Sequence, residues 1–177
     1  MKIYHGSIEQ VYSPEIREPN HRLDYGAGFY ATTSYEQAKR WVQRKMRERK
    51  TNKGYVNVYE FNRQTMNTLK TISFPTPTEE WVDFVMRNRT EPGFTHDYDI
   101  VYGPVANDHV YAAFALYEGH VLSKQGLIAE LQTYKLVDQY LFHTERSVNS
   151  ITFVEAKEIT LVIIYKCVDT FSLKRPK

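Results

Sequence analysis

Apolar and polar residues alternate in several short stretches of this chain, and alternation of period two is the pattern of half-buried β-strands. In one such stretch, Val56 and Val58 would face one side of a sheet while Tyr59 faces the other. The pattern predicts seven strands, over residues 4–10, 29–32, 55–61, 98–105, 137–143, 151–157 and 159–166.

Other segments place apolar residues at the three- and four-residue spacing of an amphipathic helix. The first helix begins after Ser34, which has the spacing of a capping box with Gln37. The second begins with Thr76 as its cap and Pro77 in its first turn. Two short helices and a proline-containing loop complete the pattern, over residues 109–117, 123–131 and 11–23.

The order of these elements predicts an α+β fold with antiparallel pairing, because strands outnumber long helices and do not alternate with them regularly. With 177 residues, the chain has the length of one domain. We assign residues 1–157 to its main body and residues 158–177 to a closing strand and tail of the same domain.

Composition bears mainly on cellular location. Cys167 is the only cysteine, so no intramolecular disulfide can form, which suits a reducing cytosol. The chain opens without the apolar core of a signal peptide. Its longest apolar run, residues 159–165, is too short to cross a bilayer. We therefore expect a cytoplasmic protein without a membrane partner.

Charge is unevenly distributed, although the formal net charge is only +2. Basic residues crowd into one segment, which contains Lys39, Arg40, Arg44, Lys45, Arg47, Arg49 and Lys50. This segment is either the solvated face of a helix or a docking surface for RNA or an acidic protein, and the sequence leaves both interpretations open.

Several familiar catalytic patterns are absent from the sequence. It has no GxxxxGK phosphate loop and no HExxH zinc motif, and Gly26 and Gly28 alone do not make a dinucleotide fingerprint. Asp97, Asp99 and Asp108 are close in sequence, and such carboxylates can hold Mg²⁺ for phosphodiester hydrolysis. The alternative is that they act as turn and cap residues.

A more specific signal comes from three short segments in order, Tyr4-His5-Gly6-Ser7, Gly26-Ala27-Gly28-Phe29-Tyr30-Ala31 and Asp138-Gln139-Tyr140-Leu141-Phe142. Together they resemble the ADP-ribosyltransferase superfamily, in particular its His-Tyr-Glu branch, which includes poly(ADP-ribose) polymerases and diphtheria-like toxins. Up to about Phe153 the chain also looks like an uncharacterised bacterial family placed in that superfamily. The resemblance implies two small antiparallel sheets that enclose an NAD cleft, with helices at the flanks.

The resemblance also implies how each motif would hold NAD, the co-substrate. His5 and Ser7 would contact ribose, and the backbone of Gly6 would contact the nicotinamide amide. In the second motif, Gly28 lies just before Tyr30, whose ring would lie against nicotinamide.

Two further residues extend this assignment. Trp41 follows Tyr30 by eleven residues, where the polymerases place a second ring on nicotinamide, although its helix face could equally belong to the core. Arg22 is either a contact of the pyrophosphate or an exposed residue before a turn.

The third motif departs from the family, because Gln139 stands where the family has its catalytic Glu. A carboxylate there would stabilise the positive charge that grows on ribose as nicotinamide leaves. Glutamine can accept the hydrogen bond of the ribose 2′-hydroxyl but carries no charge, so we expect transfer of single ADP-ribose units. Glu145, roughly 20 Å further along a straight strand, is the reserve candidate for the carboxylate.

The resulting prediction is an NAD-dependent mono-ADP-ribosyltransferase with His5, Tyr30 and Gln139 as catalytic residues. Its acceptor would be a protein or nucleic acid, as for a bacterial or phage toxin that is paired with an antitoxin. Alternatives are a silent NAD-binding module, suggested by Gln139, and a metal-dependent nuclease built on Asp97, Asp99 and Asp108. An RNA 2′-phosphotransferase would need further arginines and a second histidine that we do not find.

Overall fold

The computed structural model describes residues 1–17, 23–104, 108–134 and 136–160. Its strands are β1 (Lys2–Ser7), β2 (Phe29–Thr32), β3 (Lys53–Phe61), β4 (Thr71–Ser73), β5 (Ile100–Pro104), β6 (Asp138–Phe142) and β7 (Ile151–Thr160). Its helices are α1 (Tyr35–Arg49), α2 (Glu79–Thr90), α3 (Asp108–Glu118), α4 (Lys124–Gln132), α5 (Glu145–Val148) and the 3-10 helix η1 (Arg63–Asn67).

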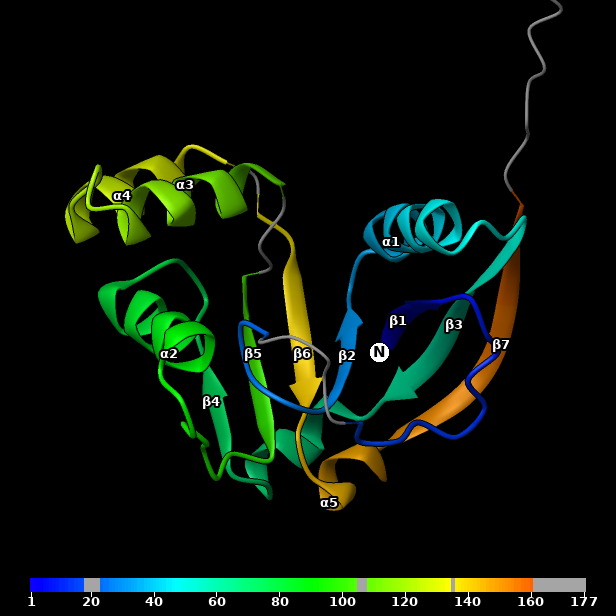
Figure 1. Cartoon of the computed structure of the whole chain (residues 1–177). Helices are drawn as coiled ribbons and strands as arrows, with labels where there is room; N and C mark the ends of the chain where they lie inside the picture. Colours follow the sequence, from blue (N-terminus) through cyan, green and yellow to red (C-terminus); the bar gives the residue numbers. More distant parts are fainter. Residues whose placement is uncertain (18–22, 105–107, 135, 161–177) are drawn as a thin grey trace, which may run out of the picture.

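The described strands join into one mixed sheet in the order β4-β5-β6-β2-β1-β3-β7, as Figure 1 shows. Neighbouring strands are antiparallel except β4 and β5, which are parallel. The α+β class predicted from the sequence is therefore confirmed. The expectation of two separate sheets is not met by the described strands. They form one sheet, because Tyr4 in β1 pairs with Thr32 in β2 and so joins the half with β1, β3 and β7 to the half with β2, β4, β5 and β6.

That junction between the halves is narrow. β1 pairs with β3 from Lys2 to Ser7, and β2 pairs with β6 along its whole length, whereas one residue pair joins β1 to β2. Two well-paired halves of the sheet thus meet at a thin seam, the single residue pair between β1 and β2. Beyond this pair, β1 and β2 lie side by side without continuous backbone pairing.

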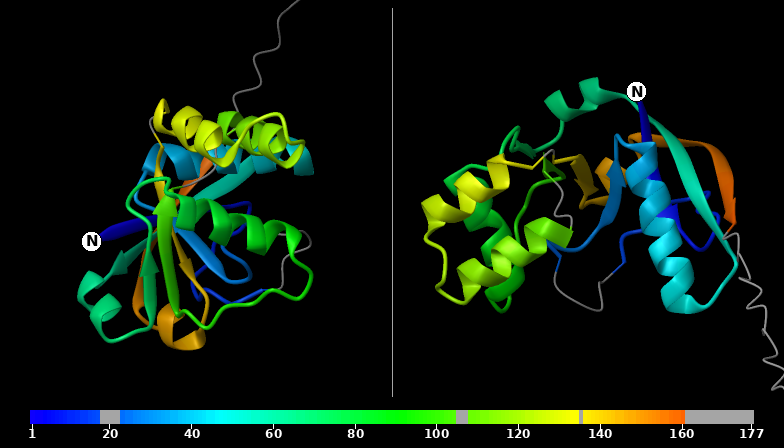
Figure 2. Two further views of the ribbon diagram at one scale, coloured as in Figure 1. Left: turned by 90° about the vertical axis from the view of Figure 1, so that its left-hand side faces the viewer. Right: turned by 90° about the horizontal axis from the view of Figure 1, so that it is seen from above.

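Helices cover the two halves separately. Helix α1 lies over β1 and β3, while α2, α3 and α4 gather over the other half of the sheet (Figure 2). On the buried face of α1, Ala38, Val42 and Met46 pack with Val56 and Ile159 of the sheet. The larger core beneath α2, α3 and α4 includes the buried aromatic residues Tyr25, Phe74, Trp81 and Phe114.

Helix caps follow the sequence signals with one correction. The side chain of Ser34 accepts a hydrogen bond from the backbone N–H of Gln37, so the cap of α1 is as predicted. The cap of α2 is Thr78, not Thr76, because the hydroxyl of Thr78 accepts from the N–H of Trp81. The helix therefore starts at Glu79, two residues after Pro77.

The strand predictions hold for β2, β3, β5 and β6 to within about two residues, with larger changes elsewhere. The two strands predicted at the C-terminal end are one strand as far as Thr160, because β7 pairs with β3 along its length, with one irregularity at Val58 and Tyr59. Residues 161–166 of the prediction lie outside the described residues. Among the described helices, none combines the length and apolarity needed to span a membrane.

Candidate functional site

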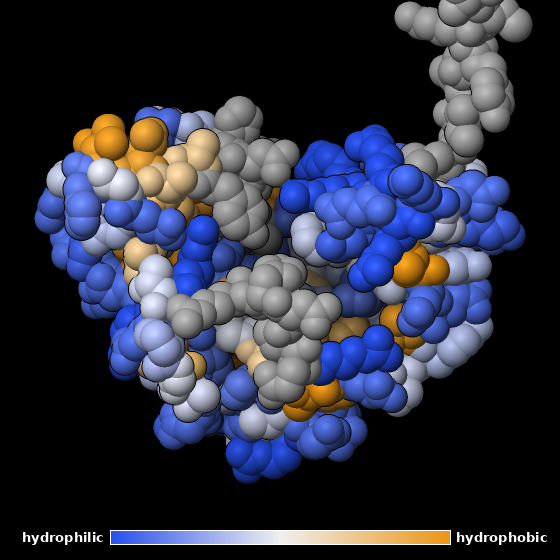
Figure 3. All heavy atoms as spheres, viewed as in Figure 1, coloured by the Kyte–Doolittle hydropathy of each residue, from blue (hydrophilic) through white to orange (hydrophobic). Residues whose placement is uncertain are grey.

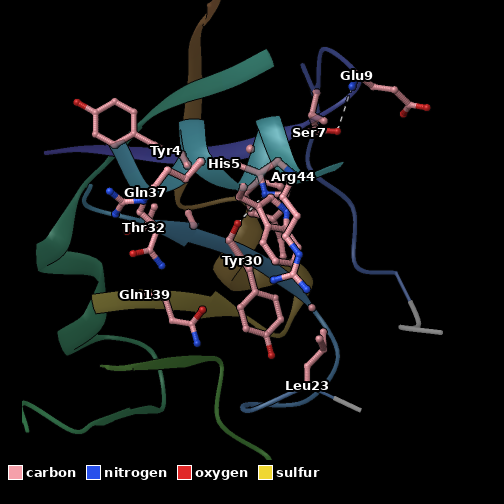
Figure 4. Close-up of a pocket in the computed structure, with 18 of the residues that line it drawn as sticks. Tyr4, His5, Ser7, Glu9, Leu23, Tyr30, Thr32, Gln37, Arg44 and Gln139 are labelled. Carbon is pink, nitrogen blue, oxygen red and sulfur yellow. Dashed lines mark hydrogen bonds between the residues drawn. The ribbon is translucent and has the colours of Figure 1, made fainter. Parts of the chain in front are cut away.

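A cavity of about 910 Å³ lies where the ends of β1 and β2 meet α1, with β6 contributing at one end (Figure 4). Its size is that of a typical small-molecule site. The structure brings together in its lining the described residues that the sequence assigned to NAD, namely His5, Gly6, Ser7, Gly28, Tyr30, Trp41 and Gln139. Residues far apart in sequence therefore share one cavity.

His5 is held in one tautomer by the backbone. Its Nδ1 lies 2.7 Å from the carbonyl oxygen of Tyr30, and because a carbonyl only accepts, Nδ1 carries the proton. Its ring also packs against Phe29, with 4.4 Å between ring centroids. Burial lowers the pKa of His5, an effect that the hydrogen bond to Tyr30 opposes. The ring is therefore neutral at pH 7, and Nε2 is left as a hydrogen-bond acceptor.

Tyr30 is fixed by the turn that precedes β2. Its hydroxyl donates to the carbonyl of Gly26 at 2.6 Å and accepts from the backbone N–H of Tyr25 at 3.3 Å. These bonds hold the ring in the cavity wall, and Figure 4 shows it at the same side as Gln139 and Leu23. A ring fixed in this way can present its face to a flat ligand at little entropic cost.

Gln139 is buried in the sheet, with 8% of its surface exposed. It pairs with Thr32 of β2 on one side and Gly103 of β5 on the other. The hydroxyl of Tyr25, a neighbour of Gln139, donates to the carbonyl of Pro104 and accepts from the indole N–H of Trp81, both at 2.7 Å. Burial raises the pKa of Tyr25, so this neighbour of Gln139 stays neutral.

The predicted glycines have packing roles of their own. A Cβ on Gly6 would lie 2.5 Å from the carbonyl oxygen of Ala38, so glycine lets α1 approach β1. Gly28 has φ of +142°, and a Cβ there would lie 2.5 Å from the carbonyl oxygen of Phe142. Sequence reasoning explained these glycines by ligand contact, whereas the structure gives each a steric reason that is independent of any ligand.

Trp41 is not a core residue. Its side chain is exposed to 43%, and the ammonium group of Lys45 lies 4.9 Å from its ring centroid. Helix α1 buries Ala38 and Val42 instead, so the indole is left at the rim of the cavity. Its position is compatible with stacking on a ligand that enters the cavity.

Two sequence candidates lie elsewhere. Glu145 does not continue the β6 strand, because the capped turn at Thr144 ends the strand and Glu145 begins α5. It is exposed and is not among the residues that line the cavity in which Gln139 lies. Arg22 lies outside the described residues.

Two of the three aspartates of the nuclease alternative are engaged in ion pairs. Asp97 pairs with Lys70, and Asp99 binds Arg146 through both carboxylate oxygens, at 3.0 and 3.1 Å. Asp108 begins α3, and its side chain is not described. Within the described part of the chain, no group of three or more His, Cys, Asp or Glu residues is placed to hold a metal ion.

Sequence reasoning missed one part of the lining. Arg40, Arg44 and Arg47 of α1 all border the cavity. Their spacing of four and three residues places them on one helix face, and that spacing was the available signal. The basic segment is thus divided between a cavity face and a solvent face.

Two histidines with lowered pKa predict a stability that depends on pH. Burial is the main cause of the lowered pKa of both His5 and His96. His96 donates from Nε2 to the carbonyl of Tyr25 at 2.8 Å, and its buried Nδ1 has no partner among the described residues. Such groups take up protons more readily in the unfolded chain, whose histidine pKa is near 6.5.

We therefore expect the free energy of unfolding to be highest above the histidine pKa of the unfolded chain. It should decrease as the pH falls below that value toward the lowered pKa values of the folded protein. Urea unfolding at pH 7.5, 6.5 and 5.5 measures this slope. His96→Gln cannot titrate and should flatten it, and the double variant His5→Asn/His96→Gln should flatten it further. An equal slope in all three proteins would contradict the prediction.

A family model described as "Protein of unknown function (DUF3990)" matches residues 1–153, and the chain therefore belongs to this family. The matched segment contains every residue that lines the cavity. No curated protein matches the chain.

Proposed function

We propose that this member of the DUF3990 family is an NAD-dependent mono-ADP-ribosyltransferase that transfers ADP-ribose to a macromolecule. One observation carries the proposal: His5, Tyr30 and Gln139 come from three distant segments and line one cavity. They lie in the three separate sequence segments that carry the resemblance to ADP-ribosyltransferases. The thin seam between β1 and β2, beside the cavity, also supports an arrangement like that of an ADP-ribosyltransferase.

In this proposal, each residue has a defined task. The unprotonated Nε2 of His5 accepts a hydrogen bond from a ribose hydroxyl, and Tyr30 and Trp41 contact the two faces of nicotinamide. The side-chain carbonyl of Gln139 accepts from the 2′-hydroxyl of the nicotinamide ribose. The bond between the anomeric carbon and nicotinamide breaks with its electron pair leaving on nicotinamide. A nucleophile of the acceptor then bonds to that carbon and loses its proton.

Gln139 limits the chemistry to transfer of single units. Its amide orients the ribose but does not offset the positive charge that develops there, so turnover is modest. The acceptor is a protein or nucleic acid in the cytoplasm, and the activity is that of a bacterial or phage toxin, which an antitoxin protein holds in check. Gln139 also favours a second candidate, a silent NAD-binding module, because it lacks the charge of the family's catalytic Glu.

The test is to incubate the protein with NAD labelled on the adenylate and, separately, on nicotinamide, with cell lysate as the source of acceptors. We expect free nicotinamide to appear together with label on a protease- or nuclease-sensitive product. NAD binding without nicotinamide release would replace the transferase with the silent module. Absence of both binding and release would overturn the NAD site.

Replacement of Gln139 by Glu separates the two candidates further. A carboxylate at this position would stabilise the charge on ribose, so we expect nicotinamide release to rise by about tenfold or more. Gln139→Met is the matched control, because it keeps the size but cannot accept the hydrogen bond, and it should lower release. Equal rates in wild type and both variants would show that Gln139 does not touch the reacting ribose.

A further inference from the structure

We propose that Arg40, Arg44 and Arg47 of α1 form a binding site for the diphosphate of a nucleotide. The inference rests on the proposed function in one respect, since it names the part of the dinucleotide that α1 would hold. It adds a set of residues, on α1, that the sequence resemblance does not assign to the ligand.

The first argument is the length of the cavity along α1. Its lining includes residues of this helix from Gln37 to Arg47, a separation of about 15 Å at the rise of an α-helix. Gln37 is near the end of α1 that follows β2, on which Thr32 pairs with Gln139. The arginines lie progressively further from that end. An extended ligand with its nicotinamide near Tyr30 would therefore place its phosphates alongside the arginines.

The second argument is that two of these cations have no competing ion-pair partner among the described residues. Among the described residues, Arg40 and Arg47 form no ion pair. Arg44 lies 3.1 Å from Glu48, but both side chains are about half exposed, and such pairs are weak. Guanidinium groups bind phosphate oxygens in a bidentate manner, so one helix face with three of them suits a diphosphate.

Acidic side chains of the same cavity do not cancel this charge. Glu15 pairs with Arg17 at 3.3 Å, and the buried carboxylate of Asp24 lies 3.7 Å from Arg89. Glu9 is the remaining described carboxylate in the lining, and it is exposed. The α1 side of the cavity is therefore its cationic side.

The direction of the arginines favours a small ligand over a long polyanion. Lys39 and Arg49 belong to the same helix but do not line the cavity, and Figure 3 shows a strongly hydrophilic outer surface over α1. A nucleic acid lying on the helix would use that outer surface. Arg40, Arg44 and Arg47 share the cavity with Tyr30 and Gln139 instead.

The experiment measures the affinity for ADP-ribose, which has the diphosphate but no nicotinamide, by titration calorimetry at 50 and 500 mM salt. The double variant Arg40→Gln/Arg47→Gln should raise the dissociation constant by about tenfold or more and reduce its dependence on salt. The control Lys39→Gln/Arg49→Gln removes the same charge from the same helix and should change the constant by less than about twofold. Circular dichroism melts verify that both variants fold.

Several outcomes would overturn the inference. These are the absence of ADP-ribose binding to the wild-type protein, equal losses in both double variants, or an Arg40/Arg47 variant that binds ADP-ribose normally. If the Arg40→Gln/Arg47→Gln variant lost binding to a single-stranded oligonucleotide but kept its affinity for ADP-ribose, the arginines would be assigned to nucleic-acid binding. ADP-ribose binding that depends on the arginines, without nicotinamide release, would support the site and contradict the transferase, so the two failures are distinguishable.

Discussion

Replacement of His5 by alanine is expected to lower nicotinamide release from NAD by about a hundredfold or more. The reason is geometric: the Tyr30 carbonyl occupies Nδ1 at 2.7 Å, so Nε2 is the ring atom left to bind ribose. Without that contact the sugar is no longer held in the orientation in which its anomeric carbon can be attacked. Burial lowers the pKa of His5, so the acceptor is present throughout the neutral range and is lost only in acid.

His5→Asn is the variant that separates ligand binding from support of the fold. Its amide N–H can donate to the Tyr30 carbonyl in place of Nδ1, but it has no acceptor at the position of Nε2. We expect Asn to restore much of the unfolding free energy that alanine loses while release stays low. If Asn restored nicotinamide release as well, the role of His5 would be structural.

The sequence predicts most strands well, because strand prediction depends on the local alternation of apolar and polar residues. β2 is predicted residue for residue, and Ser34 caps α1 as expected. β4 was missed because three residues give too short a pattern, and it is held by parallel pairing with β5, a distant segment. The union of the strands into one sheet rests on the contact between Tyr4 and Thr32, which no local pattern encodes.

The cavity was predictable in part for a similar reason. His5, Tyr30 and Gln139 lie in short segments that resemble motifs of fixed spacing, and all three line the cavity. The sequence places Arg40 and Arg47 in the basic segment but does not assign them to the cavity, because the sequence of a helix does not say which of its polar faces meets a cavity. That choice depends on how α1 packs on β1, and Gly6 permits their close approach, because a Cβ there would lie 2.5 Å from the carbonyl oxygen of Ala38.

The aspartates near β5 provide the largest expected effect on stability. Asp99 is 1% exposed and accepts hydrogen bonds from the backbone N–H of Lys70 at 2.9 Å, from Thr144 at 2.5 Å and from Arg146. It thereby joins the segment before β4, the start of β5 and the cap of α5. Burial acts to raise the pKa of Asp99, but these bonds together lower it below its usual value.

Asp99→Ala is therefore expected to reduce the free energy of unfolding by about 2 kcal/mol or more, since several donors lose their partner at once. Asp97→Ala is the matched control, because Asp97 is exposed and its ion pair with Lys70 is at the surface, so little change is expected. The stability from Asp99 should be present above its unfolded pKa, near 3.9, and be lost as pH falls through its lowered folded pKa.

Carboxylates grouped to hold a metal repel one another, so their removal without metal would stabilise the protein. Urea unfolding in a chelating buffer distinguishes the two roles, and a stabilised Asp99→Ala would return these residues to the nuclease hypothesis.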